Sequence, residues 1–222
     1  MKIILKYLFV IVVSNSAYSG PLEEFIVDPN TYVDGQPVSD YTKTWWQWTY
    51  TMPKEQSPVR DMTGEFCHVG QRGNVWFLAG GYGTSKIKRT CIVPEGKYIF
   101  FPVINMVYYP RHEASITCDT AIEFAALNND TAIEIEVNLD SATAWNPADT
   151  RIRPDGCFDL LGLIPKELNA PKVYPAASDG YWVMLKPLSK GKHFLSFKAR
   201  YNREKGAYSQ MAQDIEYELT VK

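Results

Sequence analysis

The loop predicted between residues 54 and 73 contains the residues best suited to acid–base catalysis. Asp61, Glu65 and His68 lie within eight residues of one another, beside Cys67. A carboxylate that orients a histidine can make it a general base, provided that the two side chains meet in space. These residues therefore indicate a hydrolase as one hypothesis. Their spacing does not force contact, so the alternative is a solvated loop held by a disulfide.

Four oxygen-bearing side chains could bind calcium if the fold brought them to one rim. They are Asn105, Asp119, Asp155 and Asp179. Calcium loops in sequences are typically runs of closely spaced ligands such as D-x-D-x-D-G, and this chain has no such run. Dispersed residues of this kind more commonly cap turns. We therefore predict no bound metal and no cofactor.

Other catalytic motifs are incomplete. His112 and Glu113 begin an H-E-x-x-H zinc motif, but Ile116 occupies the position of the second histidine. Ser85 lacks the following glycine of the nucleophile elbow G-x-S-x-G. The cysteines lack the close C-x-x-C spacing of a zinc site. Without a recognised catalytic set, we favour a protein that is not an enzyme.

Aromatic residues make up 14% of the chain and are its most suggestive feature for binding. A tryptophan side chain offers a flat face and one N–H donor, which suit stacking on sugars or on apolar ligands. The candidate platform consists of Trp45, Trp46, Gln47, Trp48 and Tyr50, with Tyr108, Tyr109 and Trp145 as further contributors. The alternative is that the helix plugs one end of the fold and its tryptophans are core. Helical spacing favours this alternative.

One helix and a series of strands must position these candidates. Residues 37–52 predict a helix, with Ser39 or Asp40 as its N-cap and Pro53 at its end. One apolar stripe along it is formed by Tyr41, Trp45, Trp48 and Met52. Residues 118–128 also have helical spacing and predict a second short helix.

Apolar runs, alternating or continuous, predict about seven or eight strands. They span residues 75–79, 86–93, 98–107, 133–139, 156–161, 181–185, 193–201 and 215–221. The run 98–107 is apolar on both sides, which is typical of a central strand. Strands at these spacings predict a mainly β fold, a two-sheet β-sandwich that is immunoglobulin-like or jelly-roll-like.

The first 19 residues have the pattern of a secretory signal peptide. Lys2 and Lys6 flank the start of an apolar run at residues 7–13, and residues 17–19 form a small-x-small cleavage site. This run is far shorter than the roughly 20 apolar residues of a membrane-spanning helix. We therefore expect cleavage, no later transmembrane segment, a single domain over residues 20–222, and a secreted or periplasmic location.

The chain has an even number of cysteines, which predicts two disulfides in an exported protein. Three pairings of Cys67, Cys91, Cys118 and Cys157 are possible. We favour Cys67 with Cys91 and Cys118 with Cys157. The first pair brackets a predicted strand–turn–strand unit, and the second brackets another sheet segment.

Three blocks of the sequence have a familiar order. They are WWQWTYTMP at residues 45–53, the segment 61–105 with CHVGQRGNVWFLAG and RTCIVPEGKYIFFPVIN, and SDGYWVMLKPLSKGKHFLSF at residues 178–197. Together they resemble a group of uncharacterised secreted bacterial proteins. The resemblance implies bacterial origin, export and a disulfide between Cys67 and Cys91, and it carries no activity. The last block is also similar to the final hairpins of immunoglobulin-like sandwiches, which concerns the fold only.

We expect an exported, non-enzymatic β-sandwich that acts as a binding or envelope-associated module. Its candidate partners are a carbohydrate, a small apolar ligand or another envelope protein. The net charge of −2 lacks the basic excess that nucleic-acid binding requires. The alternatives are a secreted hydrolase that uses His68 with Asp61 or Glu65, and a structural or interaction subunit.

Overall fold

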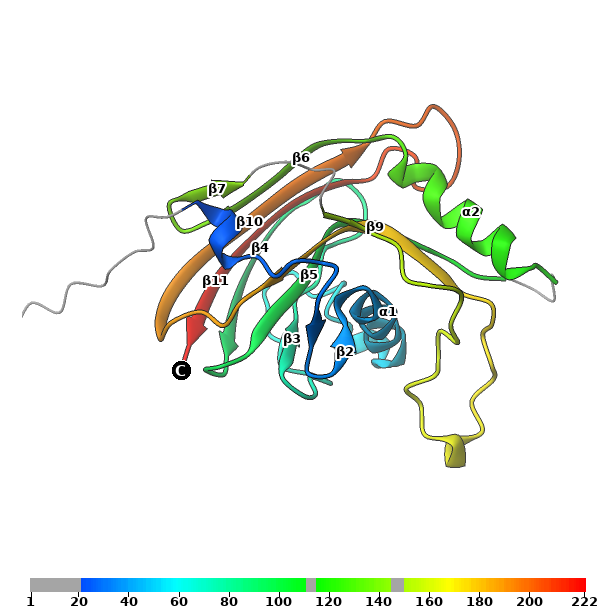
Figure 1. Ribbon diagram of the computed structural model, residues 1–222, viewed down its shortest axis with the longest axis horizontal. Helices are drawn as coiled ribbons and strands as arrows, with labels where there is room; N and C mark the ends of the chain where they lie inside the picture. The colour runs from blue at the N-terminus through cyan, green and yellow to red at the C-terminus, as the bar shows by residue number, and fades with distance from the viewer. Residues whose placement is uncertain (1–20, 111–114, 145–149) are drawn as a thin grey trace, which may run out of the picture.

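The computed structural model describes residues 21–110, 115–144 and 150–222, so the predicted signal peptide, His112, Glu113 and Trp145 lie outside the described residues. Two β-sheets pack together, with helix α1 (Tyr41–Thr51) beneath one sheet and helix α2 (Cys118–Asn129) beside β5 and β9 (Figure 1). The predicted mainly β sandwich with a Trp-rich helix and a second short helix is confirmed. In the part of the chain that is described, neither helix has the length and hydropathy to cross a membrane.

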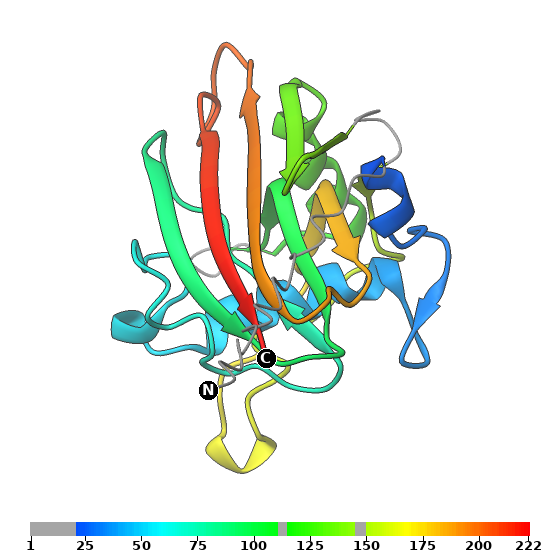
Figure 2. The same cartoon turned by 90° about the vertical axis from the view of Figure 1, so that its left-hand side faces the viewer.

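One sheet has five strands and the other has four. The five-stranded sheet contains, in spatial order, β4 (Lys86–Val93), β11 (Ala212–Val221), β10 (Gly191–Tyr201), β6 (Ala132–Leu139) and β7 (Ala142–Ala144). The four-stranded sheet contains β3 (Val75–Phe77), β5 (Tyr98–Tyr108), β9 (Ala177–Leu185) and β8 (Arg151–Ile152). Figure 2 shows β4, β11, β10 and β6 side by side.

Short elements complete the described chain. A two-stranded ribbon of β1 (Tyr32–Val33) and β2 (Gln36–Pro37) precedes α1. Single 3-10 turns are η1 (Leu22–Phe25), η2 (Val38–Asp40), η3 (Lys54–Gln56) and η5 (Lys166–Leu168). Because η2 runs directly into α1, the helical conformation extends over most of the predicted range 37–52.

Several successive strands cross from one sheet to the other. β3 lies in the four-stranded sheet, β4 in the five-stranded sheet, and β5 in the four-stranded sheet again. The chain reverses direction between β3 and β4 and again between β4 and β5. β3 and β5 therefore run in the same direction and pair in parallel. β9 pairs with β5 and β8, whereas β10 pairs with β11 and β6. The expected hairpin within residues 178–197 is therefore wrong, because each strand finds its hydrogen-bond partners in a different sheet.

The four-stranded sheet is buried on both faces. One face packs against the five-stranded sheet, where Phe101 stacks on Phe197 with ring centroids 4.9 Å apart. The other face packs against α1, where Phe100 stacks on Trp182 at 5.2 Å. Because β5 lies between β3 and β9 with a core on each side, its sequence is apolar at nearly every position. Its predicted role as a central strand is confirmed.

α1 presents its apolar stripe to this second core. Tyr41, Trp45 and Trp48 are all buried. The Trp45 ring meets Trp182 edge-on at 5.4 Å, and the Trp48 ring lies 5.5 Å from Phe77. The helix ends two residues before Pro53, since the residue preceding a proline is pushed towards extended backbone. The position of α1 is thus set by ring packing on the sheet.

Both favoured disulfides are present. Cys67 is bonded to Cys91, which joins the loop after η3 to β4. Cys118 is bonded to Cys157, which joins the first turn of α2 to the segment between β8 and β9. The predicted pairing is therefore confirmed, and each bond connects elements that are distant in sequence.

Two segments differ from the predicted strands. Residues 156–161 do not form a strand, because Gly156 turns the chain with φ 65° and only Phe158 pairs, in an isolated bridge to Ala176. Conversely, β9 begins at Ala177, before the predicted strand 181–185, because residues 177–180 pair with residues 105–108 of β5. Pairing and burial override the weak strand propensity of Ala-Ser-Asp-Gly.

We expect replacement of Cys67 and Cys91 by alanine to lower the free energy of unfolding by about 3 kcal/mol. The bond joins residues 24 positions apart and so restricts the unfolded chain. Urea denaturation without a reductant, with the wild-type protein as control, measures the difference. A loss below about 1 kcal/mol would show that this bond does not brace the fold.

Candidate functional site

The structure gives the three candidate catalytic residues separate roles. Glu65 and His68 are exposed, and across the described ranges no hydrogen bond or ion pair joins His68 to Asp61 or Glu65. Four donors of its own loop bind the Asp61 carboxylate at 2.8–3.0 Å, namely the N–H groups of Thr63, Gly64 and Phe66 and the hydroxyl of Thr63. Burial raises the pKa of Asp61, but these hydrogen bonds outweigh it and hold the pKa below its ordinary value. Asp61 therefore shapes the loop, and this geometry lends the hydrolase hypothesis no support.

Two tryptophans of the candidate platform lie deep in the core. Trp45 and Trp48 are 2% and 1% exposed. Their indole N–H groups donate to the carbonyl oxygens of Leu78 and Val69, each at 2.8 Å. Their donors are thus used within the fold, as the core alternative requires, although Trp45 also borders the cavity described below.

The remaining platform residues lie nearer to an opening. Trp46 is 8% exposed and donates to the hydroxyl of Ser178 at 3.2 Å. The Gln47 side chain donates to the carbonyl oxygen of Asp159 at 2.8 Å. Trp46 and Tyr50 also line a cavity, which Gln47 does not. The structure thus places this part of α1 at the wall of a pocket.

The four residues considered as calcium ligands are not gathered in one place. Asp119 and Asp155 are exposed, whereas Asn105 and Asp179 are buried. Within the described segments, no group of three His, Cys, Asp or Glu residues could hold a metal ion. Asp179 instead has cationic partners.

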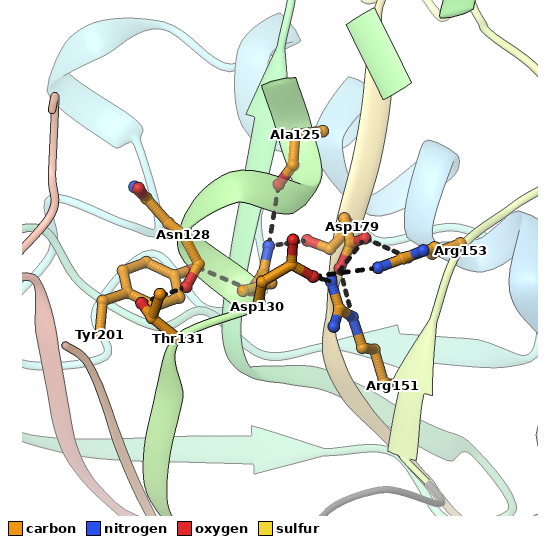
Figure 3. Close-up of polar contacts among 9 residues, drawn as sticks. Ala125, Asn128, Asp130, Thr131, Arg151, Arg153, Asp179 and Tyr201 are labelled. Carbon is orange, nitrogen blue, oxygen red and sulfur yellow. Dashed lines mark hydrogen bonds and ion pairs between the residues drawn. The ribbon is translucent and has the colours of Figure 1, made fainter. Parts of the chain in front are cut away.

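Asp179 belongs to an ion cluster at the base of α2 (Figure 3). Arg151 Nε lies 3.0 Å from Asp179 Oδ1, and Arg153 forms a second ion pair with the same carboxylate. Arg151 also lies 2.6 Å from Asp130, directly after α2. Burial lowers the pKa of Arg151, but the two carboxylates outweigh it and raise the pKa above its ordinary value. The guanidinium is therefore permanently charged and links β8, β9 and α2.

Asn129 extends this cluster into the core. Its side-chain amide donates to the carbonyl oxygens of Ala125 and Asp179 at 3.1 and 3.0 Å. It accepts a hydrogen bond of 2.9 Å from the buried Tyr201 hydroxyl of β10. Burial raises the pKa of Tyr201 well above its ordinary value, so the hydroxyl stays protonated and donates. These bonds fix the end of α2 against both sheets.

A cavity opens where α1, the end of β5 and two loops meet. The tyrosine pocket, as we call it, is lined by residues including Trp46, Tyr50, Tyr82, Asn105, Tyr109 and Tyr208 and has a volume of about 60 Å³. It adjoins a wider outer groove of about 420 Å³, lined by residues including Tyr108, Phe124, Leu127, Asn128, Arg203 and Tyr208. Both cavities are lined by Met106, Val107, Tyr109 and Tyr208, so they adjoin, and we refer to the two together as one depression.

The walls of the tyrosine pocket are aromatic. Tyr50 meets Tyr109 edge-on at 5.6 Å, and their hydroxyl oxygens are 3.2 Å apart. The Trp46 ring lies 6.1 Å from Tyr50. Burial raises the pKa of Tyr82, and the positive charge of Arg60 partly opposes this rise. Flat faces and hydroxyl groups therefore converge on one small volume.

Asn105 contributes a buried polar group to this pocket. Its side chain is 9% exposed, and its Nδ2 has no hydrogen-bond partner in the described structure. Gly180 lies opposite on β9, where a Cβ would stand 2.6 Å from the Asn105 Cβ. The indole N–H groups of Trp76 and Trp182 are also unpartnered, but neither residue lines this pocket. An unsatisfied buried donor costs about 1–3 kcal/mol, so the fold bears this cost at the wall of the pocket.

Two buried side chains hold the loop that carries Tyr82. The Gln213 amide of β11 donates to the carbonyl oxygen of Gly81 and accepts from its N–H, each at 2.8 Å. A Cβ at Gly80 would lie 2.6 Å from Gln213 Oε1, so glycine permits this close approach. Arg89, 3% exposed, donates to the carbonyl oxygen of Gly80 at 3.0 Å. The rim of the pocket is thus built on a rigid support.

Tyr208 reaches the pocket from a strained backbone. Its φ of 57° lies in the left-handed region, which costs a bulky residue about 1–3 kcal/mol. The residue belongs to the β10–β11 loop, which lies beside α2 (Figure 1), and the side chain is 50% exposed. The Asn128 amide of α2 donates to the carbonyl oxygen of Ala207 at 2.9 Å and anchors this loop. A strained tyrosine at a cavity is a functional candidate.

The sequence pattern does not single out Tyr82 or Tyr208, and it indicates Asn105 only as a metal ligand. For Tyr82 a signal exists, because a tyrosine among Gly80, Gly81 and Gly83 stands in a turn that can present it. For Tyr208 no local signal exists, because the loop contacts set its left-handed backbone.

No protein-family profile matches this chain, and neither curated proteins nor solved structures yield a significant match. The resemblance of the three sequence blocks to secreted bacterial proteins therefore stays a prediction. The function has to be argued from the geometry of the tyrosine pocket and the outer groove.

We expect Asp61→Asn to reduce the acid sensitivity of the fold. The pKa of Asp61 is lowered in the folded protein, so its ionised form adds stability that is lost as pH falls through that lowered pKa, below about pH 4. Urea unfolding at about pH 6 and about pH 2.5 should show a smaller loss for the variant than for the wild type. Glu204→Gln controls for removal of an exposed carboxylate. An equal loss in Asp61→Asn and the wild type would refute this assignment.

We expect Asn105→Leu to leave the free energy of unfolding unchanged or to raise it by about 1 kcal/mol. The substitution removes a buried donor that has no partner within the described fold and keeps a similar volume. The control is Asn129→Leu, which breaks three hydrogen bonds of the cluster. This variant should clearly lower the free energy of unfolding. Comparable destabilisation of both variants in thermal unfolding would mean that Asn105 has a structural role.

Proposed function

We propose that this protein is an exported, non-enzymatic module that binds a small, mostly apolar ligand in the depression formed by the tyrosine pocket and the outer groove. The observation that carries the proposal is a cavity with aromatic walls that is also lined by the side-chain amides of Asn105 and Gln213. Ligand pockets typically combine apolar and aromatic side chains with a few fixed polar groups that orient the ligand. The depression formed by the tyrosine pocket and the outer groove has this composition.

The side chains that line the tyrosine pocket are suited to binding a small, mostly apolar ligand. Tyrosine and tryptophan offer large rigid faces and lose little conformational entropy on binding. Met106 and Met211 add flexible thioethers that adapt to an apolar shape. The amides of Asn105 and Gln213 neither gain nor lose protons near neutral pH. Such a lining suits a ligand that is held rather than transformed.

Export is the second part of the proposal. The two disulfides are consistent with an oxidising, extracytoplasmic compartment. The signal-peptide pattern of residues 1–19 supports the same location. We therefore place the ligand outside the cytoplasm, in the periplasm or beyond the cell.

The test uses N-phenyl-1-naphthylamine, a neutral dye that fluoresces in apolar surroundings. We expect it to bind the wild-type protein saturably and Tyr82→Ala to weaken its affinity about tenfold, because one wall of the pocket is lost. Tyr174→Ala is a matched control, since Tyr82 and Tyr174 are both 49% exposed and Tyr174 does not line the pocket. Fluorescence titration measures both affinities.

Two results would contradict the proposal. One is the absence of saturable dye binding to the folded protein. The other is an equal loss of affinity in Tyr82→Ala and Tyr174→Ala, which would mean that the dye binds a general apolar surface. Thermal unfolding of each variant confirms that it is folded.

A further inference from the structure

Arg203 is the charged residue of the outer groove. Its Nη1 donates to Asn128 Oδ1 at 3.0 Å, which points the guanidinium towards the end of α2. Among the described residues it makes no ion pair, and its Nε and Nη2 have no hydrogen-bond partner. An arginine presents five N–H donors in a fixed fork, so most of them stay available to a ligand.

A second cation stands at the rim of the tyrosine pocket. The Arg60 guanidinium lies over the Tyr82 ring, 5.7 Å from its centroid. Arg60 is exposed and makes no ion pair with any residue in the described ranges. The described residues that line the two cavities include no aspartate or glutamate. One arginine in the outer groove and one at the rim thus bring positive charge to this depression, although the chain carries a net charge of −2.

The shape of the two cavities indicates the apolar part of the ligand. The tyrosine pocket is walled by rings but has only about 60 Å³, so a flat body would lie mainly in the outer groove of about 420 Å³ and meet these rings with one edge. The outer groove continues this surface with Tyr108, which stacks on Phe124 at 4.8 Å. Arg203 lies in the groove and Asn105 in the pocket, so the two polar groups sit in different parts of one depression.

We propose that the ligand is a small organic anion whose planar apolar ring system lies mainly in the outer groove, with one edge in the tyrosine pocket, and whose acidic group is bound by Arg203. This inference rests on the proposed function and adds the charge and shape of the ligand to it. Arg203 suits a carboxylate or sulfonate because its fork can make two parallel charge-assisted hydrogen bonds. Arg60 adds a longer-range attraction at the rim.

The experiment compares two dyes that share their rings. 8-Anilinonaphthalene-1-sulfonate carries an acidic group, and N-phenyl-1-naphthylamine lacks it. We expect the anionic dye to bind about tenfold more tightly at low salt and to lose part of this advantage at high salt. Arg203→Gln should weaken the anionic dye about tenfold and change the neutral dye less than about twofold.

Lys205→Gln is the matched control, because it removes one positive charge from the same loop at a residue outside the cavity linings. It should leave both affinities unchanged. Arg60→Gln, at an exposed position, should weaken the anionic dye by a smaller factor than Arg203→Gln. This second variant keeps the test valid if Arg203→Gln unfolds.

Competition then tests the shape of the ligand. We expect 2-naphthoate to displace the anionic dye at lower concentration than dodecanoate, since the pocket is walled by rings. If dodecanoate displaces the dye at the lower concentration, the proposal that the ligand has a planar ring system is wrong. Equal affinity for the two dyes, or equal effects of Arg203→Gln and Lys205→Gln, would refute the proposal that the ligand carries an acidic group. Neither result would contradict ligand binding in the pocket. Failure of both dyes to bind would overturn the proposed function itself.

Discussion

The packing of α1 against the four-stranded sheet is the contact on which the rest of the structure depends. It covers the second face of β5 and β9, where Phe100 and Trp182 would otherwise meet water. Truncating one buried tryptophan typically costs about 3–5 kcal/mol, a large share of the 5–15 kcal/mol that stabilises a domain. The internal hydrogen bonds of the indoles add direction to this packing, so α1 has one orientation. That orientation places Trp46 and Tyr50 at the pocket.

The tyrosine pocket stays open because side chains outside it hold the loops that form its rim. Gln213 and Arg89 fix the loop of Tyr82, and Asn128 fixes the loop of Tyr208. Side chains held in this way cannot collapse into the space between them at low cost. The left-handed backbone of Tyr208 and the unpartnered amide of Asn105 are both unfavourable for the fold. Their presence at the same cavity agrees with a site shaped by binding, where local strain is commonly found.

The ion cluster around Asp179 has a structural role of a different kind. Asp179 is 1% exposed, so its charge has to be compensated within the fold, and Arg151 and Arg153 provide that compensation. Through Asn129 and Tyr201 the cluster joins α2 to the five-stranded sheet. A buried ion pair adds little net stability but fixes geometry when it is fully bonded. Here the ion cluster fixes the position of α2, which forms one wall of the outer groove.

The sequence by itself determined the architecture, because periodicity and apolar content report which faces are buried. The two-sided strand at residues 98–107 and the helix with stripe Tyr41, Trp45 and Trp48 follow from such local patterns. The even number of cysteines predicts two disulfides, and the favoured one of the three possible pairings is the one present. The tertiary structure alone decided strand partners and the pocket, since sheet crossovers depend on contacts between distant residues. Asn105, Tyr82 and Tyr208 lie far apart along the chain, and only the packed sheets bring them to one cavity. The glycines around Tyr82 indicate a turn, but the unpartnered amide of Asn105 and the left-handed backbone of Tyr208 arise from that packing, so no local pattern reveals them.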